Sequence, residues 1–159
     1  IRRYTANRRD IEAAENMLVG SLFAGIAFSW ARLGDVHAMS HPVSAFFNVP
    51  HGVANAILLP TIVEYNALAD HGKYFNIYNY IAPLPAALEE FTPDLVDAIV
   101  ELNDSLGIPD GLEEVGVTKD KFDAMADDAM KSGNIAVNPR STTKKDVLAL
   151  YEKAFSGLE

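Results

Sequence analysis

The apolar positions of the chain recur at helical spacing, and no run of residues alternates strictly between apolar and polar. The longest apolar run, residues 17–31, lies in a segment (11–33) that follows Asp10, a residue type that commonly caps helices. A bilayer span needs about 20 apolar residues. The pattern therefore predicts a helix over 11–33 that is buried in a protein core and does not cross a membrane.

Proline, glycine and capping residues divide the rest of the chain into further helices. We expect these over residues 36–47, 52–69, 73–81, 92–106, 119–131 and 146–155. Asn48 and Pro50 separate the first two, and Pro60 predicts a kink in the second. Gly107 ends the helix over 92–106, Thr118 is the expected cap of the next helix, and the last begins near Thr142 or Thr143.

The segments 82–91 and 132–143 are expected loops. The predicted fold class is all-α, a helical bundle, with one all-helical domain over residues 1–159.

Composition narrows the classes of function. The net charge of −9 argues against a nucleic acid or an anionic membrane as partner. The chain has no cysteine, which excludes disulfides and thiolate metal sites and fits a reducing compartment, so we expect a cytoplasmic protein. It begins IRRYTANRRD, without initiator Met or the apolar core of a signal peptide, which indicates an internal start with sequence missing upstream.

Three of the four histidines lie between residues 37 and 51. His37 and His41 are four apart, so on one helix they point the same way and could chelate a divalent metal. His51 would lie about 21 Å from His37 on an unbroken helix, but the break at 48–50 allows the chain to fold back. Two interpretations stay open at this point: a metal site, or histidines that only pack. Asp35 would point away from His37, so further ligands would have to come from outside this chain.

The stretch GDVHAMSHPVSAFFNVPHGVANAILLP (34–60) resembles the second signature of the iron-containing (group III) alcohol dehydrogenases. The resemblance continues, in the order of the family, through five other segments: MLVGSLFAGIAFS before it, then IVEYN, LGIP, VGV and VNPR after it. It therefore covers nearly the whole chain and includes all three clustered histidines.

The resemblance implies an NAD(P)-dependent enzyme that reduces aldehydes or oxidises small primary alcohols. In the family an N-terminal dinucleotide-binding domain, absent here, precedes an all-helical domain, and an Asp and three His hold one divalent ion, usually Fe²⁺ and sometimes Zn²⁺. The last two of those histidines fall on His37 and His51. His41 corresponds to a histidine beside the nicotinamide and is the expected catalytic and cofactor-binding residue.

The first two family ligands lie upstream of the matching residues, so we expect the chain alone to be inactive. The expected partners are the missing N-terminal domain, a small alcohol or aldehyde, and further copies of the chain in a homo-oligomer. Two alternatives remain: a helical metal-dependent hydrolase, which would need a third ligand and a general base in this chain, and a structural helical domain that binds a missing partner.

Overall fold

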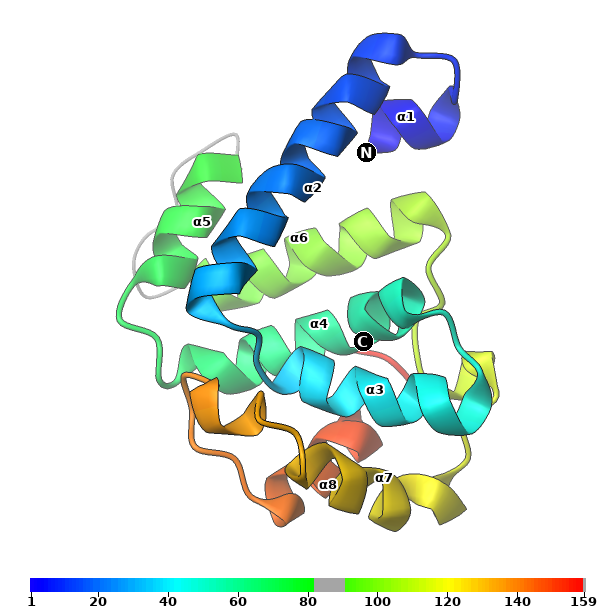
Figure 1. The fold of residues 1–159 in the computed structure, drawn as a ribbon, viewed down its shortest axis with the longest axis vertical. Helices are drawn as coiled ribbons and strands as arrows, with labels where there is room; N and C mark the ends of the chain where they lie inside the picture. Colours follow the sequence, from blue (N-terminus) through cyan, green and yellow to red (C-terminus); the bar gives the residue numbers. More distant parts are fainter. Residues whose placement is uncertain (82–90, 159) are drawn as a thin grey trace. The chain divides into compact units, whose positions relative to one another are not determined.

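A computed structural model describes residues 1–81 and 91–158 of the chain (Figure 1). These residues form eight α-helices and three short 3₁₀ helices, and no strand occurs among them. The all-α prediction is confirmed. The chain divides into two compact units, Ile1–Leu33 and a second unit from Gly34 onward, which are described separately; the expectation of a single domain stays a prediction.

The first unit contains α1 (Arg2–Ala6) and α2 (Ile11–Ala31). The predicted cap is confirmed, because Asp10 Oδ1 accepts a hydrogen bond from the backbone N–H of Ala13 at 3.0 Å. The guanidinium of Arg3 then bridges Asp10 and Glu12, 2.9 Å from a carboxylate oxygen of each. These polar contacts define where α2 begins.

The expectation that α2 is buried is wrong for this structure, in which only Ala13 of that helix is buried. Phe23 is 65% exposed and Trp30 is 87% exposed. The apolar side chains of α2 lie on all sides of the helix. The other helix of this unit, α1, has five residues and cannot cover them all. By length and mean hydropathy (21 residues, 1.3) α2 could cross a membrane, but core helices of soluble proteins have the same properties.

In the second unit, α3 (Asp35–Phe47) and α4 (His51–Ala67) are joined by a three-residue break, as predicted. Asn48 adopts a left-handed conformation (φ +55°) that ends α3, and its backbone N–H donates to the carbonyl of Ser44 at 2.9 Å. Asparagine tolerates this conformation better than most residues. The next helix starts immediately, at His51, and continues past the buried Pro60.

The remaining helices are α5 (Lys73–Ile81), α6 (Phe91–Leu106), α7 (Phe122–Met130) and α8 (Lys144–Lys153). Gly107 (φ +68°) follows α6, as predicted. The expected role of Thr118 is wrong, because a 3₁₀ turn (Lys119–Lys121) separates it from α7 and its side chain caps neither. Thr143 does cap α8, through reciprocal hydrogen bonds with Asp146.

The two expected loops have different outcomes. Of 132–143, Ile135–Val137 forms a 3₁₀ turn and the rest is loop. The expected loop over 82–91 falls outside the described residues, except that α6 begins at Phe91.

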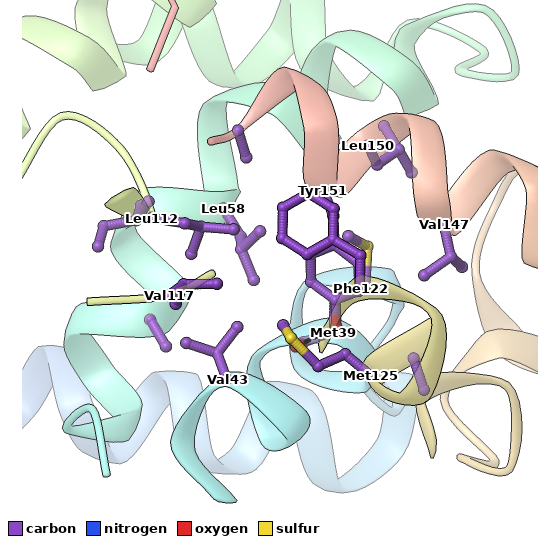
Figure 2. Packing of buried hydrophobic residues seen from close by; sticks show 14 of the residues in the cluster. Met39, Val43, Leu58, Leu112, Val117, Phe122, Met125, Val147, Leu150 and Tyr151 are labelled. Carbon is purple, nitrogen blue, oxygen red and sulfur yellow. Dashed lines mark hydrogen bonds between the residues drawn. The ribbon is translucent and has the colours of Figure 1, made fainter. Parts of the chain in front are cut away.

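In the second unit α3 contacts α4 and α7, while α8 packs on α7 and α4 (Figure 1). Figure 2 shows the central side chains of the core of this unit: Met39, Val43, Leu58, Leu112, Val117, Phe122, Met125, Val147, Leu150 and Tyr151. The hydroxyl of the fully buried Tyr151 donates to the carbonyl of Met39 at 2.7 Å. This contact ties α8 to the part of α3 between His37 and His41, so the backbone that carries these histidines is held by the core.

Candidate metal centre

The structure brings the three predicted histidines together. His37 and His41 lie on α3, half-buried and exposed respectively, and His51 is the exposed first residue of α4. The ring centroid of His51 lies 5.2 Å from that of His37 and 5.1 Å from that of His41. The expected return of the chain after the break at 48–50 is therefore confirmed.

The Nε2 atoms of His37 and His51 converge on one side chain, Asn55. Asn55 lies one turn after His51 on α4, and its Nδ2 is 3.1 Å from His51 Nε2 and 3.3 Å from His37 Nε2. Because the two ring nitrogens face the same atom, a single ion could be reached from both. The ring of His41 instead stacks on that of His51, with 25° between their planes.

Ser40 supports the orientation of His51 from the other edge of the ring. Its hydroxyl lies 3.4 Å from His51 Nδ1 and 3.4 Å from the carbonyl oxygen of His37, and the residue is fully buried. A hydroxyl that donates to the carbonyl can accept a hydrogen bond from Nδ1–H. This arrangement leaves the Nε2 lone pair of His51 available, as metal binding requires.

The electrostatics around His37 favour its neutral form. Burial lowers the pKa of His37, and the neighbouring His51 and His41 lower it further. A metal binds neutral imidazole, so the lowered pKa reduces competition from protons.

Asp35 takes no part in this cluster, in agreement with the expectation that it points away. Its side chain is fully buried, and Oδ2 accepts a hydrogen bond from Thr142 Oγ1 at 2.6 Å. Burial raises the pKa of Asp35 to about 6, against the opposing effect of the Thr142 hydrogen bond. Its other oxygen has no hydrogen-bond partner in the described part of the chain.

A pair of asparagines anchors the start of α3. Asn138 Oδ1 accepts from the backbone N–H of Asp35 at 3.2 Å and from Asn66 Nδ2 at 3.1 Å, while its Nδ2 donates to Asn66 Oδ1 at 2.7 Å. A Cβ at Gly34 would lie only 2.9 Å from Asn138 Oδ1, so the backbone of α3 can approach this closely because residue 34 is glycine. Sequence reasoning missed Asn55, Ser40 and Asn138. The spacing of four between His51 and Asn55 could have indicated that contact, whereas the contacts of Asn138 join distant parts of the chain.

Within residues 1–81 and 91–158, no group of three or more His, Asp or Glu could hold a metal ion. Glu64, on the same helix as His51, is engaged in an ion pair with Lys153. The chemistry of the available pair still suits a transition metal, because two imidazole nitrogens are ligands that Fe²⁺ and Zn²⁺ accept. The described residues thus fit two positions of a coordination sphere.

Comparison with known proteins identifies the family. Residues 1–155 match the profile of the C-terminal part of the Fe-containing alcohol dehydrogenase family. This chain belongs to that family. It is 42% identical over 148 residues to lactaldehyde reductase of Escherichia coli (strain K12), covering 92% of this chain and 39% of that protein. It is 37% identical over 157 residues to 1,3-propanediol dehydrogenase of Citrobacter freundii, covering 98% of this chain and 41% of that protein.

Solved structures agree with these relatives. A 1,3-propanediol oxidoreductase structure matches with a TM-score of 0.93 and 36% identity, over 97% of this chain and 41% of that one. An alcohol dehydrogenase from Oenococcus oeni matches with a TM-score of 0.92 and 33% identity, over the same shares. The chain therefore corresponds to the all-α C-terminal domain of oxidoreductases and spans about two fifths of the length of the curated relatives.

Proposed function

We propose that this chain forms the metal-holding part of an NAD(P)-dependent enzyme that interconverts small primary alcohols and aldehydes. The observation that carries the proposal is the convergence of His37 Nε2 and His51 Nε2 on one atom, in a chain of the Fe-containing alcohol dehydrogenase family. Three predicted properties go with it: the enzyme is cytoplasmic, homo-oligomeric and inactive when only these 159 residues are present.

His37 and His51 would hold a divalent ion, Fe²⁺ or alternatively Zn²⁺, together with ligands from another part of the enzyme. When bound, the ion supplies Lewis-acid chemistry, which polarises a carbonyl or lowers the pKa of an alcohol. The chain's own contribution is positional. Met39 and Val43 are buried in the core and so hold the part of α3 that carries His37, and Ser40 contacts the Nδ1 edge of the His51 ring.

His41 is proposed to contact the nicotinamide and to take part in proton transfer. Its ring is exposed and stacks on His51, so it lies beside the proposed metal ligands without a nitrogen committed to the same atom as theirs. An accessible imidazole can serve as a proton donor or acceptor.

The two alternative functions differ in their support. The hydrolase alternative requires a third ligand in this chain, and the described residues offer none. An interaction role has support from the exposed apolar side chains of α2, such as Leu22 and Phe23. It is compatible with the dehydrogenase proposal, because a domain that works with a partner must expose a surface for it. The family match includes α2, which supports a helix of a soluble enzyme over a membrane span.

Calorimetric titration with Zn²⁺, and with Fe²⁺ under anaerobic conditions, tests the proposal. We expect weak one-to-one binding that is lost in a His37→Ala/His51→Ala variant, because two imidazoles are only part of a coordination sphere. His71→Ala is the matched control, since this exposed histidine lies before α5, outside the cluster. Absence of binding, or tight binding that survives the double substitution, would contradict the proposal.

A further inference from the structure

Asn55 occupies an unusual position between two histidines. Its Nδ2 lies within hydrogen-bond distance of His37 Nε2 (3.3 Å) and His51 Nε2 (3.1 Å), one on each helix. The side-chain amide has two N–H donors on that nitrogen, so it can donate to both rings at once. Each Nε2 must then act as an acceptor, which places the ring proton of both histidines on Nδ1.

The surroundings of His51 accommodate this tautomer. Ser40 has a single hydroxyl proton and two neighbours, the carbonyl of His37 and Nδ1 of His51. When the hydroxyl proton is directed at the carbonyl, which can only accept, the hydroxyl oxygen is left to accept from Nδ1–H of His51. If Asn55 presented its oxygen to the rings instead, both Nε2 atoms would carry protons, and Ser40 would have to turn its hydroxyl proton from the carbonyl of His37 to Nδ1 of His51.

In this arrangement the oxygen of the Asn55 amide lacks a hydrogen bond to any part of the chain that the structure describes. Asn55 Oδ1 is buried and has no hydrogen-bond partner among the described residues. Buried polar atoms are nearly always satisfied, so an exception indicates a competing requirement. Here the amide oxygen has no partner among the described residues, while the amide nitrogen lies within hydrogen-bond distance of two imidazoles.

We infer that Asn55 is a positioning residue, whose amide group holds the His37 and His51 rings with both Nε2 lone pairs directed at one atom. The inference rests on the proposed function, in which those lone pairs bind a divalent ion. The amide N–H groups present partial positive charge to the lone pairs, as a cation would, so the metal-free chain keeps the pair of ligands assembled. Without Asn55, the ring of His37 would be free to rotate or to adopt the tautomer with its proton on Nε2.

Nitrogen NMR of the imidazoles in the metal-free chain at alkaline pH tests which ring nitrogen carries the proton. In the wild type we expect His37 and His51 to carry the proton on Nδ1. In Asn55→Leu, which keeps the approximate shape but removes both donors, His37 loses this preference, and His51 changes less because Ser40 still accepts from its Nδ1–H. Asn76→Leu, on the exposed side of α5, is the control and leaves both rings unchanged.

Titration with Zn²⁺ tests whether Asn55 assists metal binding. Ligands that are already assembled bind more tightly than ligands that must first be ordered, so we expect weaker Zn²⁺ binding in Asn55→Leu and unchanged binding in Asn76→Leu. Equal affinity would overturn the inference, and higher affinity would do so as well, because it would show that the amide competes with the ion. Unchanged tautomers in a folded Asn55→Leu chain overturn it whatever the affinity.

A second substitution covers the case in which Asn55→Leu does not fold, which circular dichroism would reveal. Asn55→Asp retains the shape but has only acceptor atoms, so it should draw the proton of His37 to Nε2; an unchanged tautomer would overturn the inference. Failure of the proposed function has a different signature, since the wild-type chain would then not bind Zn²⁺ at all. The tautomer comparison would still decide the role of Asn55.

Discussion

Replacing Asp35 with asparagine should stabilise the chain at neutral pH and leave its stability nearly unchanged in acid. Asp35 is fully buried, and burial raises its pKa from 3.8 to about 6. A carboxyl whose pKa is higher in the folded state binds its proton more tightly there, so its contribution to stability is present below pH 4 and lost as the pH rises through 6. At pH 7 the folded protein holds a buried carboxylate that the unfolded chain would solvate.

The size of the effect follows from the same pKa. One pKa unit corresponds to about 1.36 kcal/mol, so the rise to about 6 sets an upper limit of about 3 kcal/mol. Asp35 lies in the first turn of α3, where the helix dipole stabilises negative charge by about 0.3–1 kcal/mol. We therefore expect Asp35→Asn to increase the free energy of unfolding by about 1–2 kcal/mol at pH 7, with Thr142 still donating to the side-chain oxygen.

Urea unfolding of both proteins, followed by circular dichroism at pH 4 and pH 7, measures this difference. Other carboxyl groups titrate in both proteins and cancel in the comparison. A difference that does not grow with pH would refute the reasoning, as would a variant that is less stable than the wild type at pH 7. Thr142→Val is a useful companion, because it removes the hydrogen bond that opposes the rise in pKa and should enlarge the pH dependence.

Three further substitutions test two buried or capping hydrogen bonds and the exposed surface of α2. Tyr151→Phe removes the buried hydrogen bond to the Met39 carbonyl and should lower the free energy of unfolding by about 1 kcal/mol in urea titrations; an unchanged midpoint would contradict the contact. Thr143→Ala removes the cap of α8 and should cost about 1 kcal/mol at pH 7. This cost should shrink below about pH 4, because the Thr143 hydrogen bonds lower the pKa of Asp146 and are lost when that carboxyl protonates; a pH-independent cost would argue against the reciprocal cap. Phe23→Glu, on exposed α2, should reduce concentration-dependent self-association in analytical ultracentrifugation, whereas equal association of both proteins would exclude α2 as the surface responsible.

Local sequence signals located most of the helices. Asp10 and Thr143 cap the helices that follow them, and Asn48 ends α3 in a left-handed conformation. These features depend on hydrogen bonds between residues a few positions apart, so they can be read from short stretches. Thr118 shows the limit of such reading. The sequence predicts it as the cap of an α-helix, but a 3₁₀ turn follows it and its side chain caps neither helix.

Burial could not be read in the same way. The apolar run of α2 predicted a core helix, yet Phe23 and Trp30 are exposed in this chain. A residue is buried only if other elements cover it, and the composition of a helix says how much cover it needs without saying what provides it.

The sequence by itself determined that the chain is all-α and that it belongs to the Fe-containing alcohol dehydrogenase family. It also identified His37, His41 and His51 as the candidate site residues. Only the tertiary structure decided how those rings meet. It places Nε2 of His37 and His51 on Asn55, stacks His41 on His51, and buries Asp35 away from them. The reason is physical: backbone periodicity fixes the direction of a side chain along one helix, whereas contacts between α3 and α4 depend on how the core packs them together.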